Sequence, residues 1–147
     1  MMSTPTDSRS TPSPLTCRVV RGDTSYQGKQ GLTYFTGISA ESVGAQGICL
    51  HLLRLPPGAR AHAHLHAAHE TAIYLLSGTV EMSYGPQLEQ HLVQHAGEFL
   101  YIPANMPHLP FNPYTEEAVA LLARTDPNEQ ESVTLLPELE QRYRPAP

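Results

Sequence analysis

Short apolar runs, separated by glycine and proline, make up most of the chain from residue 17 onward. Four of these runs have the length of a single β-strand and read GLTYFTG, GICLHLLRL, TAIYLLSG and TVEMSY. The second run ends at the turn signal PPG, and Gly78 separates the last two runs as expected for a hairpin. Many short strands at regular spacing are typical of a β-sandwich or a β-barrel, so the pattern predicts an all-β fold.

The two ends of the chain depart from this pattern. Residues 1–14 read MMSTPTDSRSTPSP and offer almost nothing to bury, so we expect a disordered leader there. Residues 133–142 are a candidate helical segment, which Pro137 limits to short turns unless it stands at the helix N-terminus. We therefore expect a single domain over residues 15–147, with a C-terminal tail that packs against the outside of the strands.

Composition and charge narrow the classes of function. The chain has 147 residues, enough to bury one core, and a formal net charge of −5 without any basic cluster, which argues against a nucleic-acid surface. Cys17 and Cys49 are too few for a disulfide scaffold and favour free thiols in a reducing compartment. The sequence shows no signal peptide, and no apolar window is long enough to span a bilayer. We therefore expect a cytoplasmic protein that binds neither nucleic acid nor membranes.

Residues 58–70, GARAHAHLHAAHE, contain four histidines and a glutamate. In a strand, His62, His64 and His66 would share one face, because alternate side chains point the same way. Imidazoles that converge inside a barrel could bind a metal ion, and a nearby carboxylate would add charge neutralisation. The same pattern would also suit a solvent-facing polar strand with its alanines turned inward. Spacing alone leaves both interpretations open.

A second histidine-bearing segment, GEFLYIPANMPHLPFN over residues 97–112, favours the metal site. His108 follows a turn bracketed by prolines and precedes another strand, where a histidine could also simply cap backbone groups. Two independent histidine-bearing segments on one β-scaffold are harder to explain by chance than either alone. We expect surface or structural roles for the isolated histidines, which are His51, His91 and His95.

Together the two segments resemble the paired signature of the cupin superfamily. The second cupin motif reads Gly, five residues, Pro-x-Gly, two residues, His, three residues, Asn. Residues 97–112 match it at every spacing, with Asn105 in place of the glycine. Asparagine tolerates the left-handed turn conformation, so this substitution is mild. The resemblance covers about residues 47–124, and the chain looks most like the small single-domain bacterial cupins.

The first cupin motif reads Gly, five residues, His-x-His, three or four residues, Glu, six residues, Gly. Gly58 to Glu70 match it in order, but seven residues separate Glu70 from Gly78, so that Thr71 occupies the usual glutamate place when counted from Gly78. Either a β-bulge turns Glu70 inward or the third ligand differs. His69 is the obvious substitute and His62 a weaker one, and we favour Glu70.

The resemblance implies a jelly-roll type of antiparallel β-barrel with a short C-terminal helical segment and a metal near its centre. The implied ligands of this one divalent transition metal are His64, His66, Glu70 and His108. Mn, Fe, Ni, Co, Cu and Zn are all compatible with such a set, and one or two positions would stay open for water or substrate. The candidate walls of the substrate pocket are Tyr74, Tyr101, Met106 and Phe111.

The reaction is not fixed by the resemblance, because cupins host oxygenases, isomerases, decarboxylases and plain binders. The leading hypothesis is a metal-dependent, dioxygenase-like oxidation of a small organic molecule. The second is sugar or sugar-phosphate isomerisation, for which Arg54 and Arg60 are the only basic residues near the motifs. The third is a non-enzymatic protein that binds a small molecule or a metal. We also expect a homodimer, to which residues 17–38 could supply an edge strand.

Overall fold

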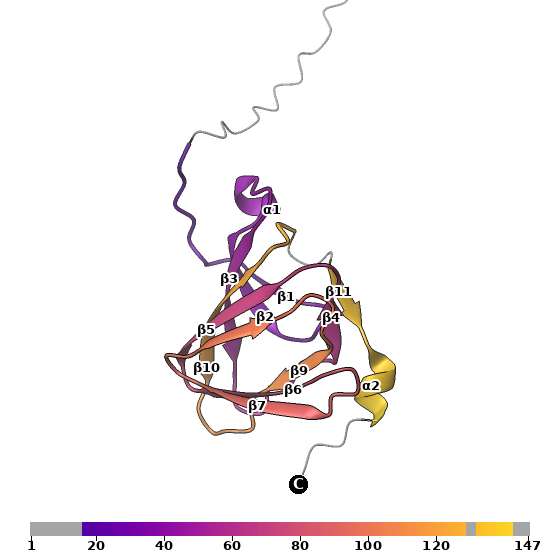
Figure 1. Ribbon diagram of the computed structural model, residues 1–147. Coiled ribbons are helices and arrows are strands. Elements are labelled where there is room, and N and C mark those ends of the chain that lie inside the picture. Colours follow the sequence, from indigo (N-terminus) through magenta and orange to yellow (C-terminus); the bar gives the residue numbers. More distant parts are fainter. Residues whose placement is uncertain (1–15, 129–131, 143–147) are drawn as a thin grey trace, which may run out of the picture.

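The computed structural model of the protein describes residues 16–128 and 132–142 (Figure 1). The predicted leader, residues 1–14, lies outside the described residues. The strands of the described part are β1 (Ser25–Gln27), β2 (Thr33–Ile38), β3 (Cys49–Leu55), β4 (His64–His66), β5 (Thr71–Ser77), β6 (Thr79–Tyr84), β7 (Gln90–His95), β8 (Phe99–Ile102), β9 (His108–Phe111), β10 (Ala118–Arg124) and β11 (Val133–Leu135). The helices of the same part are α1 (Ala40–Val43) and α2 (Pro137–Arg142).

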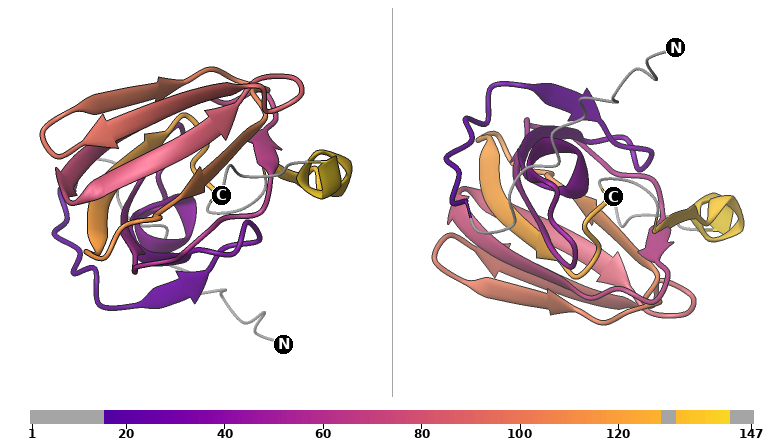
Figure 2. Two further views of the ribbon diagram at one scale, coloured as in Figure 1. Left: turned by 90° about the horizontal axis from the view of Figure 1, so that it is seen from below. Right: turned by 90° about the horizontal axis from the view of Figure 1, so that it is seen from above.

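The strands form two antiparallel sheets packed face to face (Figure 2). The first sheet has the order β1-β2-β3-β10-β5-β8, and the second has the order β11-β4-β9-β6-β7. Strands distant in the chain therefore become neighbours, as β3 and β10 do. The prediction of an all-β jelly-roll fold with a short C-terminal helical segment is confirmed. α2 begins at Pro137, where the missing N–H costs the helix no hydrogen bond.

The core follows from the alternation of side chains along the strands. In β3 and β10 every second residue is buried, so one face of each strand packs inward. Burial of each large apolar side chain stabilises the fold by about 1.5–3 kcal/mol. The main core cluster consists of Leu32, Tyr34, Leu53, Leu55, Ala61, Leu75, Val80, Ala118, Ala120 and Leu122.

A smaller apolar cluster lies on the outer side of the second sheet. It consists of Ala63, Leu88 and Leu109, and Leu139 of α2 packs against it. The C-terminal segment thus covers part of this outer face, as the sequence predicts. No helix in the described residues is long and apolar enough to cross a membrane.

The register of β5 decides which of its side chains face the interior. Thr71 pairs with Arg124 of β10 and with Ile102 of β8. The β5–β10 ladder is regular from this end, and its register shift lies at the far end, between Val119 and Ala120. Thr71 and Leu75 are therefore buried, and Glu70, one residue before the strand, falls on the exposed side.

Candidate metal centre

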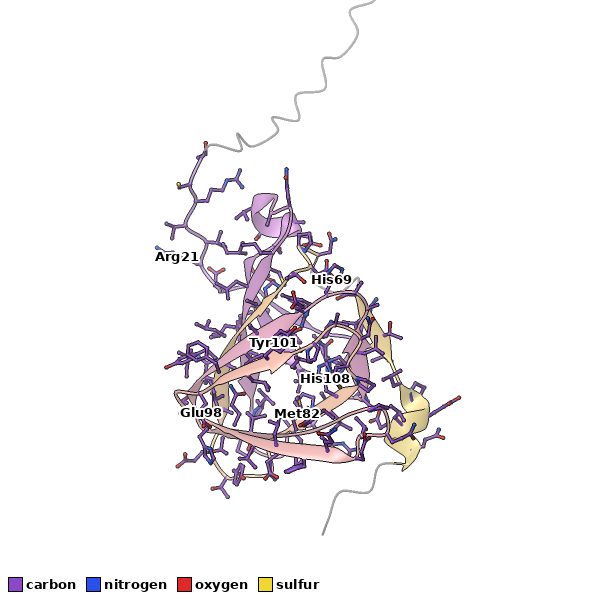
Figure 3. The ribbon with its side chains drawn as sticks, in the orientation of Figure 1. Arg21, His69, Met82, Glu98, Tyr101 and His108 are labelled. Atoms are coloured by element: carbon purple, nitrogen blue, oxygen red, sulfur yellow. The ribbon has the colours of Figure 1, made fainter. Side chains whose placement is uncertain are left out.

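Three buried histidines meet between the two sheets. β4 carries His64 and His66, and β9 carries His108, which lies in the interior in Figure 3. One ligand atom of each lies within 4.8 Å of the others, and the ring centroids of His64 and His108 are 4.2 Å apart. Each residue is at most 3% exposed. Over the described ranges, this is the only group of three or more candidate ligands that lies so close together.

Strand geometry brings the three imidazoles to one place. His64 and His66 are two residues apart on β4, so they share its inward face. His108 lies directly opposite His64 in the antiparallel pairing of β4 with β9. The next residue, Leu109, points the other way into the outer cluster.

The turn before β9 is fixed by Asn105. Its φ angle is 63°, in the left-handed region that asparagine tolerates better than most residues, as the sequence predicts. The Asn105 side-chain oxygen accepts a hydrogen bond from the Ala68 N–H at 3.0 Å. The Asn105 N–H donates to the carbonyl of His66 at 3.0 Å. The turn is thereby tied to the end of β4, which holds the His108 loop beside His66.

Hydrogen bonds at Nδ1 orient each ring. The Nδ1 of His64 lies 2.7 Å from the carbonyl of His62, and that of His108 lies 2.8 Å from the carbonyl of Met106. A carbonyl only accepts, so Nδ1 carries the proton in both rings and Nε2 keeps its lone pair. The Nδ1 of His66 lies 3.1 Å from the Ser132 hydroxyl, which can accept in the same way. Such partners are the usual means of orienting metal-binding histidines.

The environment keeps these imidazoles neutral. Burial lowers the pKa of His108 to about 4. Burial also lowers the pKa of His64 well below its usual range, and the neighbouring His108 adds to this effect. For His66, burial and then the charge of Arg124 lower the pKa strongly. A neutral imidazole is the form that binds a metal, so the group is ready to coordinate at neutral pH.

The structure does not bring Glu70 to the three histidines. Glu70 lies on the exposed side, where its carboxylate accepts a hydrogen bond from the Tyr101 hydroxyl at 2.7 Å. The expected β-bulge that would turn it inward is not present, because the β5–β10 ladder is regular from Thr71 onward. The buried side chain at this point is Thr71, which is 2% exposed and lines the same cavity as the histidines.

The two substitute ligands also lie apart from the group. His69 is half-buried, and its Nε2 lies 4.0 Å from the carboxylate of Asp126. His62 is exposed, and its Nδ1 lies 3.0 Å from Glu140. His62 has the same strand parity as His64, but it precedes β4 and turns toward α2 instead of the interior.

Arg124 is a residue of this site that the sequence reasoning did not single out. It is the last residue of β10, is 4% exposed, and lines the same cavity as the histidines. Its Nε donates a hydrogen bond to the Thr71 hydroxyl oxygen at 3.1 Å. The alternation in AVALLAR places Arg124 on the face of Ala120 and Leu122, and this pattern could have identified it.

The cavity beside the histidines is small and mostly apolar. The cavity has a volume of about 40 Å³, counted as the space that the centre of a water molecule can reach. The four predicted wall residues do not line it. Tyr74 packs on Phe99 with ring centroids 4.7 Å apart, and Tyr101 is 60% exposed, because both have outward parity in their strands. Phe111 packs against the outer cluster, and the Met106 carbonyl accepts the hydrogen bond from His108 Nδ1.

Solved structures with this fold include several enzymes. The chain is 23% identical to the polyketide cyclase RemF from Streptomyces resistomycificus, with a TM-score of 0.65 over 83% of this chain and 86% of that one. It is 21% identical to a single-residue variant of oxalate decarboxylase from Bacillus subtilis, with a TM-score of 0.65 over 77% of this chain. The match spans only 30% of the decarboxylase chain.

A third similar structure is a Cupin 2 conserved barrel domain protein from Salinispora arenicola. It is 18% identical, with a TM-score of 0.60 over 76% of this chain and 89% of that one. At these identities the likeness shows the fold alone. The comparison with curated proteins gave no match. The sequence profile of the family described as Cupin domain matches residues 51–124, which hold all three clustered histidines. This chain belongs to the cupin domain family.

Proposed function

We propose that the chain binds one divalent transition metal through His64, His66 and His108 and oxidises a small organic molecule in a dioxygenase-like reaction. The observation that carries the proposal is the convergence of three neutral, buried imidazoles beside a small apolar cavity. When bound, a metal with open positions supplies a Lewis acid and a site for dioxygen and substrate.

The donor set fits such a metal. Each ring is held at Nδ1, so its Nε2 is available as a ligand atom. Three protein ligands leave coordination positions open, which is the arrangement of catalytic rather than structural sites. Imidazole ligands suit Fe, Cu, Ni and Zn, and the structural relatives include the Bacillus subtilis oxalate decarboxylase, described as having Mn(II) centres.

The residues around the histidines would keep bulk water from the reacting groups. Leucine, isoleucine and methionine side chains make up half of the residues that line the cavity, among them Ile73, Met82 and Leu122. An apolar wall strengthens the electrostatic interactions inside and limits side reactions with water. The small volume favours a substrate of few atoms.

Sugar-phosphate isomerisation has less support, although a sugar phosphate isomerase from Silicibacter pomeroyi shares the fold, with a TM-score of 0.54 and 18% identity. Arg54 is bound to Glu117 on the surface at 2.7 Å, and Arg60 is exposed, so neither reaches the cavity. No carboxylate of the described residues lines the cavity to move a proton between substrate carbons.

We also propose a homodimer from the sheet edges. β8 is an edge strand of the first sheet and carries Phe99, which is 82% exposed, and Tyr101, which is 60% exposed. Light scattering on the purified protein is expected to give twice the 16.1 kDa mass of one chain. A mass of one chain at micromolar concentration contradicts the dimer.

Oxygen uptake tests the proposed reaction. Protein reconstituted with Fe(II) is supplied with a panel of phenols, diketones, thiol acids and small carboxylic acids, and dioxygen consumption is recorded. We expect uptake with at least one class, loss of uptake in His108→Ala, and unchanged uptake in His95→Ala. His95 is the matched control because its side chain is 65% exposed and lies outside the site. No substrate-dependent uptake with a fully loaded protein contradicts the oxidation.

A further inference from the structure

Arg124 is a buried cation at the end of the apolar face of β10. The residues before it on that face are Ala118, Ala120 and Leu122, and Arg124 itself is 4% exposed. Arginine is almost never buried without a paired anion, because removing its charge from water is costly. An anionic partner is therefore expected beside Arg124.

The described part of the chain supplies no carboxylate within ion-pair distance of Arg124, although Glu70 and Arg124 both line a second, open pocket. None of its ion pairs includes Arg124. Asp126, the next buried carboxylate along the chain, accepts a hydrogen bond from the Asn128 N–H and lies 4.0 Å from His69. The bond from Nε to Thr71 uses one of the five N–H donors of Arg124, and a hydroxyl brings no charge. The two terminal amino groups form no hydrogen bond to a described residue and are accessible to solvent or to a ligand.

The groups around Arg124 in the cavity are neutral. Burial raises the pKa of Tyr34 to about 12, so this cavity residue carries no charge at neutral pH. Thr71 and Gln94 line the same cavity and are uncharged. A divalent metal on three neutral imidazoles would add further positive charge. The cavity therefore favours an anionic ligand.

The size of the cavity limits that ligand. Its volume of about 40 Å³ compares with the roughly 10–15 Å³ that one water needs by the same measure, so it holds the equivalent of about three waters. The remaining wall is mainly apolar and includes Leu53, Leu75, Val80 and Ile102. This wall suits a short aliphatic group and not a sugar or a phosphate ester.

We infer that Arg124 binds the carboxylate of the substrate and that the substrate is a small aliphatic carboxylic acid. The inference rests on the proposed function, because the carboxylate would bind beside a metal held by the three histidines. The planar guanidinium matches a carboxylate with two parallel N–H···O bonds, which an ammonium group does not offer. Thr71 acts as a positioning residue, since its oxygen holds the Nε side of the guanidinium.

Acetate and acetamide form a matched pair of probes, because they have the same shape and differ in charge. Each is titrated into Co(II)-loaded protein at constant ionic strength, and the visible spectrum of the cobalt reports binding. We expect the wild type to bind acetate at least about tenfold more tightly than acetamide. Arg124→Gln and Arg124→Met are expected to lose this preference, and Arg124→Lys to keep part of it. Melting temperatures show whether each variant is folded. If one of the two neutral variants does not fold, the other still gives the result.

Two results would overturn the role of Arg124 while leaving the metal site intact. These are equal binding of both probes by the wild type, and a retained acetate preference in the neutral variants. If the wild type takes up no Co(II), the metal site fails instead. Metal-free protein then tests Arg124 alone, through a rise in melting temperature with acetate that sodium chloride does not produce. The inference requires this rise in the wild type and its loss in Arg124→Gln, and it fails without them.

Discussion

Thr71 lies directly opposite Arg124 in the β5–β10 ladder, and its hydroxyl oxygen accepts a hydrogen bond from Arg124 Nε at 3.1 Å. Thr71 occupies the place where the cupin resemblance, counted from Gly78, leads one to expect a glutamate. A neutral side chain bound to a cation thus stands where a metal-binding carboxylate would otherwise be. This exchange changes the charge of the site. A carboxylate at this place would neutralise the charge of a metal, whereas the cation Arg124 attracts an anion.

Thr71→Glu is expected to restore a carboxylate at the place where the cupin motif has a glutamate. The new carboxylate would face Arg124 in the buried ladder and neutralise it, so acetate binding should weaken by about tenfold or more, as loss of a charge-assisted pair does. Isothermal titration of Co(II)-loaded protein with acetate checks this. Thr71→Val removes the hydroxyl that positions Arg124 but adds no charge, so it should weaken acetate binding less than the glutamate variant does. Undiminished acetate binding by the glutamate variant would show that Arg124 does not hold the anion.

Arg124→Met is expected to stabilise the metal-free fold. The substitution removes an unpaired buried charge and extends the apolar face of β10, where such replacements can add about 1–3 kcal/mol to the free energy of unfolding. For a chain of this size, that corresponds to a rise of several degrees in melting temperature. Calorimetry without metal or carboxylate measures it. A clear fall would mean that Arg124 serves the fold more than a ligand.

Stability is expected to decrease as pH falls below about 6.5, in part because of His51. Burial and then the charge of Arg124 lower the pKa of His51 from 6.5 to about 4. Between these values the unfolded chain binds a proton that the folded chain does not, so folding loses stability as pH falls, by up to about 3 kcal/mol for this residue. His51→Asn keeps an acceptor near the Gly37 N–H and should show a shallower slope in denaturant titrations from about pH 7 to pH 4. An unchanged slope would show that His51 does not cause the loss of stability at low pH.

Asn105 should matter both for its backbone angle and for its side chain. Asn105→Gly keeps the left-handed angle and loses the bond to the Ala68 N–H, at a cost of about 1 kcal/mol. Asn105→Ala loses the bond and also strains the angle, which adds about 1–2 kcal/mol. Urea denaturation of the two variants separates the contributions. Equal losses of stability would show that the backbone angle contributes nothing.

Ser132→Ala should weaken metal binding without touching a ligand. Ser132 is the partner of His66 Nδ1, and removal of such a partner usually lowers metal affinity by about 10- to 100-fold. Competition with a zinc indicator dye gives the affinity, and the melting temperature without metal separates it from an effect on folding. The exposed Thr134 of β11 offers a control in Thr134→Ala. A metal affinity equal to that of the control would show that Ser132 does not support metal binding.

The grouping of His64, His66 and His108 could be predicted from the sequence through the cupin resemblance, because its two motifs hold these histidines. Alternation along β4 sets the shared face of His64 and His66, and Asn105 marks the turn that delivers His108. These constraints act over a few residues, so the motif spacing contains them.

The side chain beside these histidines could not be predicted in the same way. Whether Glu70 or Thr71 faces inward depends on the register of β5 against β10, a strand that lies far along the chain. Alternation in AVALLAR places Arg124 on the inward face, but a cation at the end of an apolar run also suits a strand end that reaches solvent, so alternation alone does not decide its burial. Aromatic character suggests Tyr74 and Tyr101 as pocket residues, yet strand parity turns both outward.

Metal stoichiometry tests the central claim most directly. Untagged, metal-free protein is dialysed against a small excess of Zn(II) or Co(II), and bound metal is measured by mass spectrometry for the wild type, His64→Ala, His108→Ala and the control His95→Ala. The three-histidine site predicts one metal per chain in the wild type and the control, and a loss of most of it in both site variants. A metal-free wild type, or metal content unchanged in His64→Ala and His108→Ala, would contradict the site.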